Sequence, residues 1–290
     1  MDDQVARVRA HFEAVGDAEW QRLIATPRDR ASFELHRRLL GEFVRPGDRV
    51  LEVGAGPGRF TIELARLGAR VTVTDISPVQ LELNERHVRE AGCEDAVERR
   101  YVLDIREVYE AGAGEFDVVV AYGGPLSYVF DADAEDAFHF LVYVTRPEGV
   151  VLGSVMSSVG SFRYFLPQAL EEAEKYGDEV YDHVLATGDL RAIVGSHTCQ
   201  MYRWRELEGL AAGAHGRFVA ASASNCLSLG DPEVLAAVEA DPERWAWFLD
   251  WEASMCREPG ALDGGTHILF AFRRDPEVRP TAARASTPLR

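Results

Sequence analysis

Residues 51–58 read Leu51-Glu52-Val53-Gly54-Ala55-Gly56-Pro57-Gly58. A short β-rich run, beginning at Arg49, leads into these glycines, and a helical apolar pattern follows in PGRFTIELARLG. Glycines at such a place permit positive φ angles and close approach of the backbone to a ligand. The N-terminus of the next helix offers unpaired N–H groups to an anion or a carboxylate. The stretch therefore predicts a strand, a ligand-binding loop and a helix in succession.

The chain around this stretch alternates between strand and helix patterns. Short β-rich segments occur at residues 49–53, 69–76, 97–103, 115–123 and 149–157. Helical patterns separate them at residues 57–68, from Pro78 onwards and at 133–145. This alternation predicts an α/β fold with a doubly wound, mostly parallel sheet.

The remaining segments are helical or irregular. Residues 1–45 carry a helical apolar pattern that is broken at Thr26-Pro27. Further helices are expected at 162–176, 203–214 and 231–257, and two late strands are expected in FVAASAS and HILFAF. Residues 177–200 show no clear period. We therefore divide the chain into an N-terminal helical segment (1–45), a main domain (46–274) with an insertion at 158–200, and a disordered tail (275–290).

Two other nucleotide-binding loops fit the glycine stretch less well. A dinucleotide fingerprint places its third glycine at position 59, which is Arg59 here, whereas the third glycine is Gly58. A bulky side chain where helix and strand touch is unfavourable for binding a pyrophosphate. A phosphate-binding P-loop needs Gly-Lys-Ser/Thr, and the single lysine of the chain is Lys175.

Carboxylates end the second and third predicted strands. Asp75 follows VTVT at the strand edge where doubly wound sheets bind ligands, and a carboxylate there can accept both hydroxyls of a ribose. This geometry suits NAD and other adenosine ligands equally. Asp104, followed by Ile105, could accept an adenine amino hydrogen or be an ordinary aspartate at a strand end.

Together these pieces resemble the class I S-adenosylmethionine-dependent methyltransferases over about residues 45–157. The resemblance implies a Rossmann-like fold of seven strands, with one of the late strands antiparallel, and S-adenosyl-L-methionine as cofactor. It implies that the glycine loop packs against the methionyl part, that Asp75 holds the ribose and that Asp104 faces the adenine. The cofactor-binding residues it implies are Glu52, Gly54, Gly56, Gly58, Asp75, Ile76, Asp104, Ile105 and Tyr122.

The methyl acceptor is expected near Tyr122-Gly123-Gly124-Pro125-Leu126-Ser127-Tyr128. Methyltransferases acting on amide or exocyclic amino nitrogens often have Asn/Asp-Pro-Pro-Tyr/Phe here, and this departure argues against such chemistry. The rings of Tyr122 and Tyr128 would line the transfer site, where an aromatic ring stabilises a cation, or would simply pack. Possible bases are His139, His183, His197 and Asp131. His197 and Tyr128 are our catalytic candidates.

The N-terminal segment and the insertion are expected to close the site. Phe12, Glu19-Trp20 and Arg22-Leu23 resemble a lid segment found among small-molecule methyltransferases. With the insertion as a substrate cap, they favour an O or N atom of a small-molecule metabolite as acceptor. The alternatives are a methyltransferase acting on protein or RNA, an NAD-dependent oxidoreductase, and a cofactor-binding or scaffolding protein with the Trp-rich 231–257 stretch as an interaction surface.

The charge, the cysteines and the hydropathy of the chain limit the binding partners and the location that we expect. The 48 acidic and 31 basic residues give a net charge of −17, which disfavours nucleic acid and anionic membranes as partners. The four cysteines form no Cys-x-x-Cys pair, so we expect free thiols and no bound metal. No apolar run reaches membrane-spanning length, and no signal peptide is evident, so we expect a cytoplasmic protein. A homodimer is compatible with the sequence.

Overall fold

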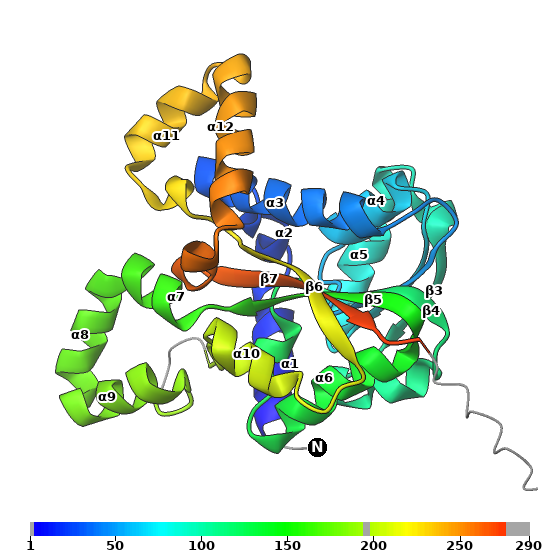
Figure 1. Cartoon of the computed structure of the whole chain (residues 1–290), viewed down its shortest axis with the longest axis horizontal. Helices are drawn as coiled ribbons and strands as arrows, with labels where there is room; N and C mark the ends of the chain where they lie inside the picture. Colours follow the sequence, from blue (N-terminus) through cyan, green and yellow to red (C-terminus); the bar gives the residue numbers. More distant parts are fainter. Residues whose placement is uncertain (1–2, 194–197, 277–290) are drawn as a thin grey trace, which may run out of the picture.

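The computed structural model describes residues 3–193 and 198–276. Its centre is a seven-stranded sheet in the order β3-β2-β1-β4-β5-β7-β6 (Figure 1). The strands are β1 Arg49–Val53, β2 Arg70–Asp75, β3 Val97–Val102, β4 Phe116–Ala121, β5 Thr145–Met156, β6 Gly216–Ala223 and β7 His267–Arg274. Paired strands are parallel except for β7, which runs antiparallel to both β5 and β6. This topology confirms the predicted doubly wound sheet with an antiparallel late strand.

Helices cover both faces of the sheet. They are α1 Asp3–Val15, α2 Ala18–Arg22, α3 Pro27–Phe43, α4 Arg59–Arg66, α5 Pro78–Glu90, α6 Ala132–Val144, α7 Ser158–Tyr164, α8 Leu166–Tyr176, α9 Asp178–Thr187, α10 Trp204–Leu210, α11 Pro232–Glu239 and α12 Pro242–Cys256. Val50 and Val118 point into a core shared with α3, α4 and α5. Leu51 and Val119 point into the opposite core, shared with α6 and α10. Burial on both faces explains why most residues of these two strands are apolar.

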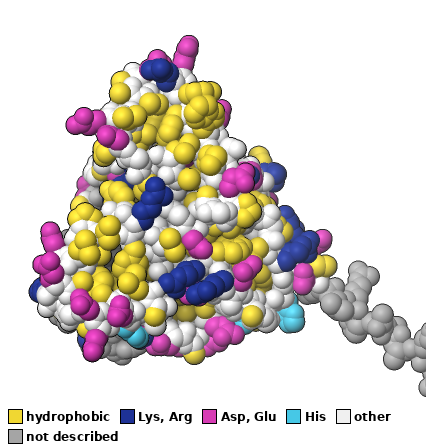
Figure 2. Space-filling model, turned by 60° about the vertical axis from the view of Figure 1, so that its left-hand side comes forward, with side chains coloured by type: hydrophobic (Ala, Val, Ile, Leu, Met, Phe, Trp, Pro, Cys, Tyr) yellow, Lys and Arg dark blue, Asp and Glu magenta, His cyan; other side chains and the backbone are white. Residues whose placement is uncertain are grey.

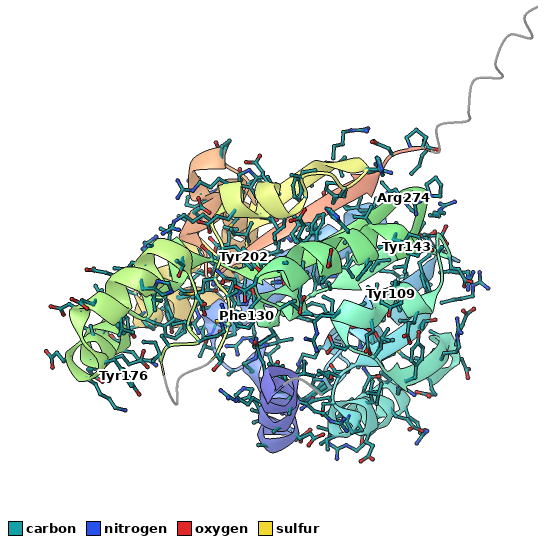
Figure 3. All side chains as sticks on the ribbon, turned by 90° about the horizontal axis from the view of Figure 1, so that it is seen from below. Tyr109, Phe130, Tyr143, Tyr176, Tyr202 and Arg274 are labelled. Carbon is teal, nitrogen blue, oxygen red and sulfur yellow. The ribbon has the colours of Figure 1, made fainter. Side chains whose placement is uncertain are left out.

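Strand β5 begins four residues earlier than the β-rich pattern predicts. Thr145 already pairs with Phe116, and the register then shifts before Val118 pairs with Val150. Glu148 lies inside this irregular stretch with φ +63°, a conformation that side chains rarely adopt. Arg274 fixes the stretch from β7 by donating hydrogen bonds to the carbonyl oxygens of residues 142, 143 and 145. Figure 3 shows Arg274 beside Tyr143 at this end of the sheet.

The Thr26-Pro27 break is the start of a helix. The Oγ1 atom of Thr26 accepts a hydrogen bond from the Asp29 amide, and an Asp29 carboxylate oxygen accepts one from the Thr26 amide at 3.1 Å. Pro27 occupies the first turn, where its missing N–H is no loss. Helix α3 therefore begins directly at the predicted break, at Pro27, and carries a complete capping box.

Helices α7, α8 and α9 project beyond the sheet (Figure 1). A small separate core joins them to the chain that follows α9, built from Tyr181 and Val184 of α9 with Ile193, Cys199 and Met201. Helix α9 lies in the 177–200 stretch that showed no clear period, because only Tyr181 and Val184 of its ten residues are buried. The predicted tail lies largely outside the described residues, which end at 276.

Helices α11 and α12 stand against α3 at the other end of the molecule. Ion pairs from Arg30 to Glu239 and from Arg38 to Asp250 hold them there. Trp247 and Trp251 of α12 are half exposed. Figure 2 shows apolar side chains gathered on the uppermost part of the molecule. No helix in the described ranges combines the length and the apolar character that crossing a bilayer requires.

Candidate cofactor and acceptor site

Two cavities adjoin where the parallel strands end. The smaller, of about 100 Å³, lies against the ends of β1, β2, β3 and β4. The larger, of about 560 Å³, lies between the N-terminal helices and the α7–α9 segment. Four residues line both cavities: Phe12, Glu19, Gly123 and Tyr128. Because doubly wound sheets bind ligands at this edge, the two cavities form the candidate site.

Asp75 ends β2 and lines the smaller cavity. Its Oδ2 atom accepts a hydrogen bond from the Gly56 amide at 2.8 Å, and its Oδ1 atom accepts one from the Ser77 amide at 2.8 Å. Burial raises the pKa of Asp75 to about 6, and the nearby Glu19 carboxylate adds to the rise. A ligand that donates hydrogen bonds here would favour the ionised form. This position suits the ribose role, which stays a prediction.

The three glycines of the loop have different surroundings. Gly54 (φ +67°) and Gly56 (φ +52°) line the smaller cavity, and a Cβ atom added at Gly56 would meet no heavy atom within 4 Å. A Cβ at Gly58 (φ +99°) would instead lie 3.1–3.2 Å from Asn84 and Val88 of α5. Gly58 is not among the described residues that line either cavity. Its position favours close packing of α4 on α5 over the predicted cofactor contact.

Glu52 lies behind the loop and not in either cavity lining as described. It is 2% exposed, and the Thr61 hydroxyl donates a hydrogen bond to its Oε2 atom at 2.6 Å. Thr61 in turn accepts a hydrogen bond from the Asn84 amide at 2.9 Å. Burial raises the pKa of Glu52 to about 8. The side chain ties β1 to α4 and α5, so any effect on a cofactor would pass through the loop.

Asp104 lines the smaller cavity beside Ile76, Ile105 and Leu103. The Arg106 amide donates to its Oδ1 atom at 2.9 Å, and the Arg106 guanidinium pairs with its Oδ2 atom at 2.9 Å. The isoleucines supply apolar walls that suit a flat ring. The predicted adenine contact would therefore share the carboxylate with Arg106.

Aromatic rings shape the junction of the cavities. Tyr122 lines the smaller cavity, and the rings of His36 and Phe60 pack against it at 4.9 and 5.2 Å. Tyr128 lines both cavities, with the ring of Phe12 at 5.3 Å in an edge-on arrangement. Burial raises the pKa of both phenols above its ordinary value. Each keeps its proton at neutral pH, so Tyr128 can position ligands but is unsuited to act as a base.

Three of the other candidate bases are described, and none of them lines either cavity. The Nε2 atom of His139 lies 3.2 Å from the Ala212 carbonyl oxygen, and Asp131 is ion-paired with Arg191. His183 of α9 lines neither cavity as described. His197, the histidine selected from the sequence, lies outside the described residues.

Helices α1 and α2 are fastened over the smaller cavity. The guanidinium of Arg59 lies 3.8 Å from the centroid of the Trp20 ring, and its Nε atom donates to the Trp20 carbonyl oxygen at 2.6 Å. On its other side, Trp20 stacks on the His87 ring at 3.9 Å. The Gln80 amide donates to the Phe12 carbonyl oxygen at 2.8 Å. Arg59, the residue that distinguishes this loop from a dinucleotide fingerprint, thus holds α2 in place.

Sequence reasoning assigned no role to His36, which lines the larger cavity from α3. Its Nδ1 atom lies 2.8 Å from the Ser32 carbonyl oxygen, so Nδ1 carries the proton and Nε2 is left as an acceptor. Burial lowers the pKa of His36 to about 4, so the ring is neutral. The available sequence signal was a histidine four residues after Ser32 on an amphipathic helix, which by itself indicates packing as readily as binding.

The larger cavity combines apolar walls with a charged rim. Aromatic and sulfur-containing side chains make up much of its lining, including Phe60, Met156, Phe162, Tyr164, Phe165 and Met201. Arginines and carboxylates of the N-terminal helices occupy one side, namely Glu19, Arg22, Arg28 and Asp29. The cavity is thus suited to an apolar or aromatic molecule with a few polar groups.

The central part of the chain is similar to a known protein family. Residues 50–149 match a family model described as a methyltransferase domain. An uncharacterised protein of Mycobacterium bovis is 30% identical over 176 residues, covering 55% of this chain and 60% of the relative. The chain therefore matches less than two thirds of that relative's length.

Two further proteins have stated activities. A ubiquinone biosynthesis O-methyltransferase of Nitrosococcus oceani is 38% identical over 73 residues, which are 25% of this chain and 30% of that protein. A crystal structure of the Burkholderia thailandensis 1,6-didemethyltoxoflavin-N1-methyltransferase contains 1,6-didemethyltoxoflavin and S-adenosylhomocysteine. It superposes with a TM-score of 0.52 at 19% identity, covering 93% of this chain and 88% of that one. At this identity the likeness shows a shared fold.

Proposed function

We propose that this chain, whose residues 50–149 match a methyltransferase-domain family model, is a class I S-adenosylmethionine-dependent methyltransferase and that it methylates an oxygen or nitrogen atom of a small molecule. S-adenosylmethionine would bind in the smaller cavity and the methyl acceptor in the larger one. The observation that carries this proposal is that the two cavities meet at Phe12, Glu19, Gly123 and Tyr128. Donor and acceptor can thereby be held on either side of one point.

The residues of the smaller cavity fit an adenosine ligand. Gly56 leaves open space beside the loop, Asp75 offers a carboxylate to ribose hydroxyls, and Asp104 lies beside Ile105 for the adenine. S-adenosylmethionine supplies an electrophilic methyl group on a sulfonium. The rings of Tyr122 and Tyr128 both line the smaller cavity, where aromatic faces favour a cation.

The larger cavity favours a metabolite as acceptor. Its volume of about 560 Å³ is in the range of small-molecule sites, and its walls come from both the N-terminal helices and α7–α9. We propose residues 1–45 as a lid and 158–200 as a substrate cap. Enclosure excludes water and aligns the reacting atoms, which can lower a barrier by roughly 7–11 kcal/mol in favourable cases.

His36 gives the acceptor cavity one defined hydrogen-bond acceptor. Its neutral Nε2 atom can accept a hydrogen bond from a hydroxyl or an amine and so orient the atom to be methylated. This supports an O or N acceptor. The stated activities of the Nitrosococcus and Burkholderia proteins, an O- and an N-methyltransferase, agree with that choice.

Calorimetry of the purified chain with S-adenosylhomocysteine and with NAD tests the proposal. We expect S-adenosylhomocysteine to bind and NAD not to bind. The Asp75→Ala variant should weaken S-adenosylhomocysteine binding by roughly 1.5–3 kcal/mol, the scale for hydrogen bonds to a charged group. Tighter binding of NAD would overturn the proposal, and an unchanged affinity in Asp75→Ala would remove the ribose assignment.

A further inference from the structure

Among the described residues that line both cavities, Glu19 is the one with a carboxylate side chain. It belongs to α2, and its side chain is 13% exposed. Arg59 and Trp20 fix this helix over the smaller cavity. The carboxylate is thus held at the junction by contacts that do not involve a ligand.

The charges around the smaller cavity are unbalanced. Its described lining contains the carboxylates Glu19, Asp75 and Asp104 and the single cation Arg106, which pairs with Asp104. Arg22 pairs with Glu19, its Nε atom lying 2.9 and 2.8 Å from the two carboxylate oxygens, but Arg22 lines the larger cavity. The negative charge of Glu19 reaches the smaller cavity, since it contributes to the raised pKa of Asp75.

Donor and product differ in charge at the reacting atom. In methyl transfer, a lone pair of the acceptor forms a bond to the methyl carbon while the carbon–sulfur electron pair returns to sulfur. The positive charge leaves sulfur and passes to the acceptor, which then loses its proton if it carries one. A fixed carboxylate near the sulfur therefore attracts the donor and not the product.

We propose that Glu19 distinguishes the cationic methyl donor from its neutral-sulfur product. This inference rests on the proposed function. Arg22, which lies on the acceptor side, weakens the attraction between Glu19 and the sulfonium. The donor is therefore favoured over the product but is not bound so tightly that it cannot react. Once the methyl group has left, the product loses the contact with Glu19 and is released more readily.

A purely structural role for Glu19 makes a different prediction. If the Glu19–Arg22 pair only holds α2 in place, its loss should weaken all ligands of the smaller cavity alike. The ratio of donor to product affinity separates the two cases, whereas the affinity for either ligand alone does not.

The test is calorimetry of Glu19→Gln with S-adenosylmethionine, S-adenosylhomocysteine and sinefungin, which carries an ammonium group in place of the methylsulfonium. We expect the Kd for S-adenosylmethionine and sinefungin to rise roughly tenfold and that for S-adenosylhomocysteine to change less than twofold. Glu13→Gln is the matched control, because Glu13 also pairs with an arginine, Arg9, on an N-terminal helix but lines neither cavity as described. It should leave all three affinities unchanged.

Arg22→Met supplies a second variant with the opposite sign. Removing the partner of Glu19 should increase the preference for S-adenosylmethionine over S-adenosylhomocysteine severalfold. The inference is overturned if Glu19→Gln weakens the charged and neutral ligands equally, or weakens none of them. If the unaltered protein binds neither S-adenosylmethionine nor S-adenosylhomocysteine, the proposed function itself fails, and the inference with it.

Discussion

Gly56 and Gly58 are two residues apart but face different neighbours. Gly56 faces open cavity space, whereas Gly58 faces Asn84 and Val88 of α5. Gly56→Ala should therefore weaken S-adenosylhomocysteine binding at least tenfold, with a loss of stability of about 1–2 kcal/mol from its positive φ. Gly58→Ala should lose roughly 2–4 kcal/mol of stability, because crowding adds to its unfavourable φ.

Urea denaturation and calorimetry on the two variants measure both effects. Binding by folded Gly58→Ala should remain close to that of the unaltered protein. Equal losses of affinity and stability in the two variants would contradict the division between ligand cradle and helix contact.

Glu52 couples stability to pH. Its folded pKa of about 8 lies above the ordinary value of 4.5, because the carboxyl is buried. Between these values the folded state keeps a proton that the unfolded state has lost, so the free energy of unfolding falls as pH rises from about 4.5 to 8. Glu52→Gln has no such proton to lose, and at pH 8 it should be more stable than the unaltered protein by roughly 2–4 kcal/mol.

Urea denaturation at pH 5 and pH 8 gives the comparison. Asp75, whose pKa is raised to about 6, titrates in the same direction in both proteins, and only its charge interaction with Glu52 differs between them. Glu85→Gln, at a surface position of α5, should leave the pH dependence unchanged. A steeper loss of stability with pH in Glu52→Gln would show that the buried carboxyl is not the coupled group.

At the scale of elements, local pattern predicts the strands and helices whose burial is regular. Strands β1 and β4 agree closely with the sequence, since both of their faces are buried and all of their residues except Arg49, Glu52 and Asp117 are apolar. The start of β5 was missed, because residues 145–148 form an irregular pairing held by Arg274 from a distant strand. Helix α9 was missed because it packs on a small outlying core and buries too few residues to show a period.

The contact between α2 and α4 should control how long a cofactor stays bound. Arg59→Met removes the contact with the Trp20 ring and the hydrogen bond to its carbonyl oxygen. These two contacts contribute about 1–2 kcal/mol to the free energy that holds α2 over the smaller cavity. Their loss should raise the dissociation rate of S-adenosylhomocysteine roughly fivefold to thirtyfold, with little change in the association rate. Stopped-flow fluorescence measures both rates.

Arg66→Met is the matched control for this change. Arg66 lies on the same helix, but its side chain is exposed and pairs with Glu63. Its replacement should not alter the dissociation rate. If Arg59→Met behaves like Arg66→Met, α2 does not limit cofactor release.

At the scale of the whole molecule, much of the lining of the smaller cavity could be predicted from the sequence, and most of the lining of the larger cavity could not. Seven of the residues expected to bind a cofactor line the smaller cavity, because a local strand–loop–helix motif and strand ends position them, namely Gly54, Gly56, Asp75, Ile76, Asp104, Ile105 and Tyr122. That they bind a cofactor stays a prediction. Glu19 was expected near the site through the resemblance of its segment to a lid, whereas His36 reaches the site only through the packing of α3 onto the sheet. Such tertiary placement leaves no local signal in one sequence.

The larger cavity is lined by two segments that lie far apart in the chain, the N-terminal helices and α7–α9. Deleting residues 1–24 removes α1 and α2 but keeps the Thr26 cap and all of α3, whose Leu39 and Leu40 belong to the core. The fold should therefore survive, while Glu19 and Phe12 are lost from the junction. We expect S-adenosylhomocysteine affinity to fall at least tenfold and methyl transfer to small-molecule acceptors to be abolished. Circular dichroism verifies the fold, and calorimetry the affinity. Wild-type affinity in the truncated chain would rule out a lid. Methylation of ribosomal RNA by the truncated chain would overturn the proposal of a small-molecule acceptor. The net charge of −17 argues against RNA as a substrate.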